Sequence, residues 1–185
     1  MKRKFIDEMK IISPIRQKSI IEVYDIVEED TGTYAVLEPM KGKRMSDVVA
    51  KKPLSGEAAL YYLWDMLKAL DVLHKRGIFH RHILPYHIYL EEWRAVLTEF
   101  GAARFFVAQT TRRLTQYLSP GFSPLEEYTD SLSTTITYAA DLYGLGATFY
   151  YALTQQVPTD APTRLLKKEK QKLAHLRELR RDIPL

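Results

Sequence analysis

The chain has 185 residues, of which 46% are hydrophobic and 27% charged, and its formal net charge is +4. This composition is ordinary for one folded domain and excludes a disordered or collagen-like chain. The absence of cysteine excludes disulfides and thiolate metal sites. The mild charge does not indicate a nucleic-acid partner. No apolar run approaches the roughly 20 residues that span a bilayer, and no signal peptide is evident, so we expect a cytoplasmic protein.

A short helix and a hairpin are predicted at the start of the chain. Residues 5–12 carry apolar side chains at helical spacing, and Pro14 ends this amphipathic pattern. Residues 20–28 and 34–38 have the composition of strands, and a turn at residues 30–32 separates them. An antiparallel hairpin is the simplest interpretation.

The clearest predicted helix covers residues 55–75, with Ser55 as its N-cap. Its apolar residues recur at intervals of three and four, which predicts one buried face. That face consists of Leu60, Leu63, Trp64, Leu67, Leu70 and Leu73. Tyr61, Tyr62 and Trp64 also suit a stacking surface for a cofactor or base, but their place among leucines favours core packing.

The second half of the chain predicts two short strands and two helices. Residues 88–90 and 95–97 read as the strands, and residues 105–135 as a loop. Residues 139–153 are apolar on nearly all sides, which is typical of a helix buried within a domain. Residues 164–181 form a basic helix with a partial leucine stripe. The elements together predict an α+β, mainly α, fold with a small sheet at one end.

The most informative segment is residues 80–88, which read HRHILPYHI. Residues 73–79 (LHKRGIF) precede it, and residues 96–104 (VLTEFGAAR) follow it. This order resembles the HRD loop, strand and DFG motif of the protein kinase family.

The resemblance extends to other segments of the chain. Residues 5–8 (FIDE) resemble the start of the αC helix, and residues 37–40 (LEPM) resemble the hinge. Residues 120–128 (PGFSPLEEY) resemble the APE motif of bacterial Ser/Thr kinases, and residues 141–146 (DLYGLG) resemble the start of helix αF.

This resemblance, over about residues 5–160, implies a truncated kinase-like fold with αC, two N-lobe strands and the C-lobe through αF. We expect a single domain over residues 1–185. Residues 1–40 would be an N-lobe remnant, residues 41–163 the C-lobe, and residues 164–185 a basic terminal helix.

The family's chemical groups are replaced at the matching positions. The loop's Asp, Lys and Asn are here His82, Leu84 and His87, and the DFG Asp is Glu99. No Gly-x-Gly-x-x-Gly occurs in these 185 residues, and no strand-three Lys is present to pair with Glu8. Because phosphoryl transfer depends on positioning and charge neutralisation, these changes favour a pseudokinase that is not an enzyme, with no catalytic residue and no cofactor.

The positions that hold the family's fold are retained. They are Glu8, His80, Arg81, Phe100, Gly101, Glu126 and Asp141. The resemblance implies that His80 and Phe100 stack with Ile12 in a buried column, whose base Asp141 anchors through backbone hydrogen bonds from the loop. The Arg that usually pairs with the Glu of the APE motif is missing, which leaves the role of Glu126 open.

Two alternatives remain for the altered cleft. His82, His87 and Glu99 are a plausible set of metal ligands, but their spacing is no recognised metal motif, and satisfied polar side chains in an inert cleft are favoured. The rival function is an atypical metal-dependent transferase or kinase, with Glu99 as metal ligand and His82 as base. A chain without selected function is a third interpretation, which the intact apolar pattern disfavours.

The expected function is protein binding, as a scaffold or allosteric regulator of a partner such as an active kinase. We expect a partner or a second copy to bind through αC and the exposed sheet face, which the missing N-lobe half would leave uncovered. The basic helix at residues 164–181 is either an ordinary solvated helix or a contact surface for an acidic partner or an anionic membrane.

Overall fold

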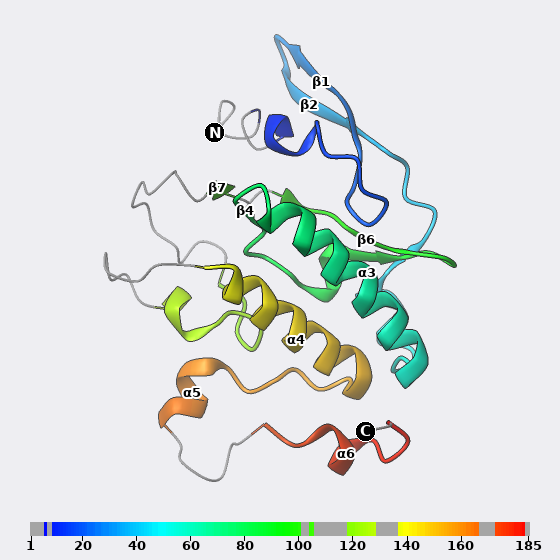
Figure 1. The fold of residues 1–185 in the computed structure, drawn as a ribbon, viewed down its shortest axis with the longest axis vertical. Helices are drawn as coiled ribbons and strands as arrows, with labels where there is room; N and C mark the ends of the chain where they lie inside the picture. Colours follow the sequence, from blue (N-terminus) through cyan, green and yellow to red (C-terminus); the bar gives the residue numbers. More distant parts are fainter. Residues whose placement is uncertain are drawn as a thin grey trace.

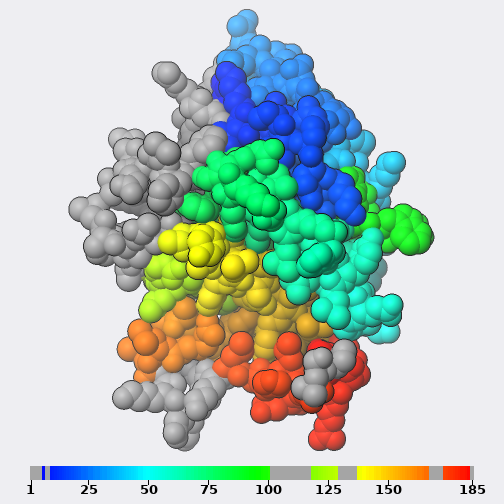
Figure 2. All heavy atoms as spheres, viewed as in Figure 1, coloured from blue at the N-terminus to red at the C-terminus, as the bar shows by residue number. Residues whose placement is uncertain are grey.

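A computed structural model of the chain describes residues 6, 9–100, 104–105, 118–128, 137–166 and 173–183. A hairpin lies at one end, two long helices cross the middle, and the C-terminal segments lie at the other end (Figure 1). The space-filling view shows the same order along the long axis (Figure 2). The predicted α+β, mainly helical fold is confirmed.

The strands form three small antiparallel sheets in the described residues. Their bounds are β1 (Val23–Glu29), β2 (Gly32–Leu37), β3 (Lys43–Arg44), β4 (Ile78–Phe79), β5 (Ile88–Leu90), β6 (Ala95–Leu97) and β7 (Arg104–Phe105). β1 pairs with β2 in the predicted hairpin, and β3, β5 and β6 form a sheet in that order. The third sheet pairs β4 with β7.

The helices include two that the sequence predicts, over residues 55–75 and 139–153. Their bounds are α2 (Met45–Val49), α3 (Gly56–His74), η1 (Pro85–His87), η4 (Leu125–Tyr128), α4 (Tyr138–Thr154), α5 (Ala161–Leu166) and α6 (Leu176–Leu179). Ser55 caps α3, since its side chain accepts a hydrogen bond from the Ala58 N–H at 3.2 Å. α4 ends at Gln155, which has a left-handed φ of 59°.

The buried face of α3 differs from the predicted one. Leu60 and Trp64 are 62% and 61% exposed, so the prediction that they pack in the core is wrong, as it is for Tyr61. The helix also buries small residues, Ala59 and Ala69, and it packs against both α4 and β6. The full buried set is Ala59, Asp65, Met66, Ala69, Leu70 and Leu73.

The predicted basic helix over residues 164–181 is also wrong. Residues 173–175 are not helical, and His175 starts the separate short helix α6 by accepting a hydrogen bond from the Arg177 N–H. Arg180 follows α6 and donates to the Leu153 carbonyl at 2.8 Å. Residues 176–180 therefore contact α4 through this side-chain hydrogen bond to its backbone rather than as part of one amphipathic helix.

The N-terminal helix corrects a prediction about binding. Residues 9–12 are helical, and Ile6, Met9 and Ile12 are at least nine-tenths buried in this chain. The expectation that the apolar face of this helix lies uncovered is therefore wrong. Among the described residues, no helix is long and apolar enough to span a membrane.

Candidate functional site

Asp141, at the start of α4, holds the beginning of the loop at residues 80–84. Its Oδ2 accepts the His80 backbone N–H at 3.0 Å, and its Oδ1 accepts the Arg81 N–H at 2.6 Å. The His74 ring lies against the same carboxylate, with Nε2 2.8 Å from Oδ2. Asp141 is only 1% exposed, so these donors replace the water that an ionised carboxylate would otherwise need.

The same face of α4 holds the rest of the loop. Thr148 donates its hydroxyl to the Ile83 carbonyl at 3.2 Å. A Cβ on Gly144 would lie 3.4 Å from that carbonyl, so the loop runs directly over this glycine. Asp141, Gly144 and Thr148 are spaced by three and four residues, which places them on one side of the helix.

Hydrogen bonds determine the tautomer of the His80 ring. Because a carbonyl only accepts, Nε2 carries the hydrogen that is donated to Thr98 O at 2.9 Å. The other nitrogen, Nδ1, then accepts the His82 N–H at 3.3 Å. Burial lowers the pKa of His80 to about 4, against the opposing effect of Asp141, so the ring is neutral at pH 7. Its edge packs on Phe100 at a centroid distance of 4.8 Å.

His82 and His87 lie together at the other end of the loop. Their ring centroids are 4.6 Å apart, and Nδ1 of His87 donates to the His82 carbonyl at 2.8 Å. Nε2 of His82 lies 3.3 Å from the Ser119 hydroxyl. Burial first, then His87 and His80, lower the pKa of His82 to about 4. Leu84, which replaces the loop's Lys, is half-buried before η1.

Glu99 is exposed and follows β6 in a left-handed conformation, with φ of 66°. This conformation is uncommon for a residue other than glycine, and the flanking residues hold it. Thr98 donates both its N–H and its hydroxyl to the His87 carbonyl, and Phe100 is fully buried. No three His, Asp or Glu side chains of the described residues are arranged around a possible metal ion, so Glu99 does not join the two histidines in one ligand set.

The comparisons with known proteins agree with this architecture. The protein kinase domain family matches residues 1–183. The chain belongs to the protein kinase family.

Its relatives within this family include several bacterial kinases. A probable serine/threonine-protein kinase of Clostridium perfringens is 31% identical over 181 residues, which are 93% of this chain and 25% of that protein. PrkC of Bacillus subtilis, a serine/threonine-protein kinase, is 28% identical over 85% of this chain and 24% of its own length. Another probable serine/threonine-protein kinase, of Clostridium acetobutylicum, is 28% identical over 98% of this chain and 28% of that protein. The chain thus spans about a quarter of the length of these relatives.

These relatives correct the expectation that the chain is not an enzyme. They match most of the chain and carry the names of serine/threonine kinases, which points to an enzyme. The expectation rested on the replaced groups His82, Leu84, His87 and Glu99, and on the absence of a Gly-x-Gly-x-x-Gly motif and a strand-three Lys from these 185 residues. The relatives and the architecture of the loop support the kinase family, without evidence of an inactive member.

Near the kinase loop, the structure reveals a buried acid that the sequence analysis missed. Glu127 is 4% exposed, and burial raises its pKa, while a hydrogen bond from Ser123 and the charge of Arg81 act in the opposite direction. The sequence analysis singled out the half-buried neighbour Glu126 instead. No signal in the sequence distinguishes two adjacent glutamates, because packing alone decides which one turns inward. Glu8 and Gly101 lie outside the described residues.

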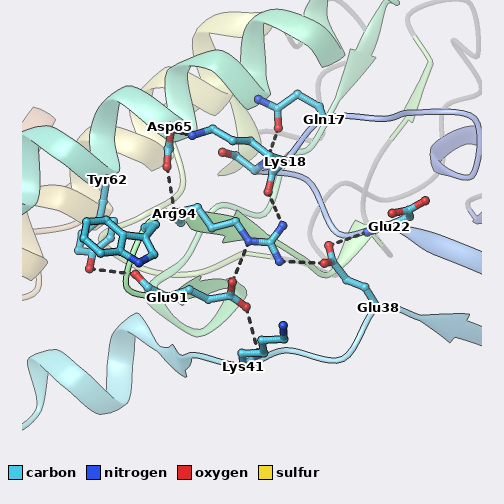
Figure 3. Close-up of polar contacts among 12 residues, drawn as sticks. Gln17, Lys18, Glu22, Glu38, Lys41, Tyr62, Asp65, Glu91 and Arg94 are labelled. Carbon is cyan, nitrogen blue, oxygen red and sulfur yellow. Dashed lines mark hydrogen bonds and ion pairs between the residues drawn. The ribbon is translucent and has the colours of Figure 1, made fainter.

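A second missed feature is the ion-pair network around Arg94, beside residues 37–40, which resemble the kinase hinge (Figure 3). Its guanidinium donates to Glu91 and to Glu38, each at 2.8 Å, and to the Lys18 carbonyl at 2.8 Å. Glu38 also accepts the Glu22 N–H at 3.0 Å. Arg94 therefore ties the hairpin and hinge to the turn between β5 and β6.

Proposed function

We propose that this chain is a serine/threonine-kinase-type phosphotransferase domain whose cleft uses His82 and Glu99 where the family has two aspartates. The observation that supports the proposal is that Asp141 fixes the start of the loop. Three donors form hydrogen bonds to this buried carboxylate. A loop held in this way suits a reaction that depends on positioning. The names of the relatives support the same reaction class.

Glu99 is the residue that would hold the Mg²⁺ of a bound nucleotide. Mg²⁺ is usually bound by one or two carboxylates together with phosphate oxygens and water, so a single exposed carboxylate fits this ion. The metal supplies charge neutralisation on the phosphates when it is bound. His87 contributes less, because its Nδ1 is already committed to the His82 carbonyl.

His82 would orient the hydroxyl of the substrate. Its lowered pKa keeps the imidazole neutral at pH 7, so one ring nitrogen can accept a hydrogen bond from an alcohol. The distance of 3.3 Å to the Ser119 hydroxyl illustrates this kind of contact. A base with a pKa of about 4 removes a proton poorly, so we assign His82 an orienting role and expect slow turnover.

The test measures transfer of the γ-phosphate of ATP to a general protein substrate, with Mg²⁺ or Mn²⁺. We expect phosphate incorporation by the wild-type chain and a loss of at least about tenfold in Glu99→Gln, because one metal-binding charge is removed. Glu28→Gln is the matched control, since Glu28 is exposed at the hairpin tip. Incorporation by the wild-type chain no higher than by Glu99→Gln would overturn the proposal.

A second role, as a protein-binding regulator, is favoured by the exposed face of the hairpin. Tyr24 and Tyr34 are 58% and 51% exposed, and Val36, two residues after Tyr34 on the same face of β2, is 44% exposed. Exposed apolar patches of this kind mark interfaces. We infer that a partner or a second copy binds to this face of the hairpin. The N-terminal helix takes no part in this contact, because its apolar residues are buried.

Light scattering after gel filtration tests self-association through this face. Tyr34→Lys together with Val36→Lys should convert a dimer to a monomer, while Glu28→Lys, which adds a lysine at the exposed tip, should not. A wild-type chain that is monomeric at all concentrations leaves a different protein as the only binding partner for this face.

A further inference from the structure

A groove lies beside the segment that follows the hinge-like residues 37–40. It has a volume of about 980 Å³ and runs between the segment at residues 41–43, the start of α3 and the turn at residues 91–94. The candidate cleft residues His82, His87 and Glu99 do not line it. Figure 3 shows its polar side, where Lys41, Tyr62, Glu91 and Arg94 converge.

The floor of the groove is apolar and firmly held. It is formed by Val48, Leu54, Ala58, Tyr62 and Leu90. A Cβ on Gly42 would lie 2.1 Å from the Leu90 carbonyl, so the hinge backbone packs directly on β5. The Tyr62 hydroxyl donates to the Glu91 carbonyl at 3.3 Å, which joins α3 to the turn. These contacts make the groove a preformed surface.

Trp93 extends the apolar surface at the open side of the groove. Its side chain is 73% exposed at the turn between β5 and β6. That turn protrudes from the side of the molecule (Figure 1, Figure 2). The Tyr61 hydroxyl donates to the Trp93 carbonyl at 2.5 Å and holds the backbone of the turn. Large exposed aromatic side chains are enriched at the centres of binding surfaces.

The rim of the groove carries net positive charge, because it is lined by four cationic side chains (Lys18, Lys41, Lys43 and Arg94) and two acidic ones (Glu91 and Glu92). Arg94 is paired with Glu91 and Glu38, and Lys18 with Asp65 at 3.4 Å. By contrast, Lys41 and Lys43 form no salt bridge with any residue of the described parts of the chain. Two lysine ammonium groups therefore stand beside an apolar floor and an exposed indole.

We propose that this groove docks an extended segment of a partner protein in which carboxylate side chains alternate with leucine-like ones. An extended segment places successive side chains on opposite sides, so one row fills the apolar floor while the other reaches Lys41 and Lys43. Charge complementarity selects an acidic segment over a basic one. The proposal does not depend on the chemistry of the cleft, since it concerns binding alone.

Fluorescence anisotropy tests the proposal with a fluorescein-labelled peptide that alternates glutamate and leucine. We expect saturable binding that weakens as NaCl is added, and no binding of the same peptide with lysine in place of glutamate. Lys41→Glu combined with Lys43→Glu should weaken binding by at least about tenfold. Lys10→Glu together with Lys75→Glu is the control, because these exposed lysines lie outside the groove and should change the affinity by less than about twofold.

A pair of tryptophan variants separates the groove from the exposed surface of α3. Trp93→Ala should weaken peptide binding by about tenfold, whereas Trp64→Ala should not, since Trp64 is similarly exposed but does not line the groove. Equal binding of the acidic and basic peptides, or no saturable binding of either, would overturn the proposal. So would an affinity that is unchanged in both the lysine double variant and Trp93→Ala.

Discussion

His80 and Asp141 show how single side chains stabilise the kinase loop. The carboxylate accepts the backbone N–H groups of His80 and Arg81, and the imidazole spans from Thr98 to the backbone of His82. Both nitrogens of the His80 ring are used, one as donor and one as acceptor. A protonated ring would have two donors and no acceptor, and would lose the bond from His82.

This arrangement predicts that stability falls in mild acid. The ordinary pKa of His80 in the unfolded chain is near 6.5, and its pKa in the folded chain is about 4, so the unfolded state takes up the proton first. The free energy of unfolding should therefore drop by about 2 to 3 kcal/mol between pH 7 and pH 4.5 through this group alone. Urea denaturation at a series of pH values measures this drop in the free energy of unfolding.

Two substitutions serve as the comparison for this titration. His80→Gln should be less stable than the wild-type chain at pH 7 and show a smaller loss towards pH 4.5, because the titrating group is gone. Lys52→Gln, at an exposed lysine outside the loop, should keep the wild-type pH dependence. A wild-type slope retained in His80→Gln would assign the acid sensitivity to other groups.

At the scale of the element, one face of α4 determines the path of the loop. Asp141, Gly144 and Thr148 each contact residues 80–83, and any side chain at Gly144 beyond a methyl group would meet the Ile83 and Phe122 carbonyls. Gly146 lies on the exposed side of the same helix, where an added Cβ would have no atom within 4 Å. The two glycines therefore form a matched pair with opposite environments.

We predict opposite responses of this pair to substitution. Gly144→Leu should lower the free energy of unfolding by roughly 2 to 3 kcal/mol through overpacking, and should reduce phosphotransfer by displacing the loop. Gly146→Ala should raise stability by up to about 1 kcal/mol, because alanine favours helix more than glycine does. Thermal denaturation followed by circular dichroism measures both. A stable and fully active Gly144→Leu variant would contradict the role of this face.

At the scale of the whole molecule, Arg94 joins segments that lie far apart in sequence. It contacts Glu38, 56 residues earlier, and Lys18, 76 residues earlier. Neighbouring carboxylates, Glu91 first, raise its pKa, so it stays charged throughout the accessible pH range. The forked guanidinium suits this task, since one lysine ammonium cannot donate in the same geometry.

Loss of this network should loosen the hinge. Arg94→Met is expected to cost about 2 kcal/mol of stability and to speed amide hydrogen exchange at Lys41, whose N–H donates to Glu91 at 3.0 Å. Arg94→Lys should lie between the wild-type chain and Arg94→Met, both in stability and in the rate of exchange at Lys41. Arg76→Met, at an exposed arginine, should change neither quantity. Unchanged exchange at Lys41 in Arg94→Met would show that the network does not hold the hinge.

Local sequence patterns predicted where the helices lie better than they predicted which residues of each helix are buried. The cap at Ser55 and the apolar run before Gln155 located α3 and α4, because both signals act within a few residues. The buried face of α3 was not predictable in the same way. Leucine and alanine both count as apolar, and only the tertiary packing decides that Ala59 is buried while Leu60 is exposed.

The sequence by itself determined the family and the position of the loop. The residues around His80, Phe100 and Asp141 occur in the order that is typical of the family. This order can be read from the sequence without knowing how the chain packs. Only the tertiary structure decided that Glu127 is buried, that Arg94 joins the hairpin to the turn between β5 and β6, and that Arg94 helps to line a groove. These features depend on contacts between segments distant in sequence, whose energies come from burial and geometry that no local pattern records.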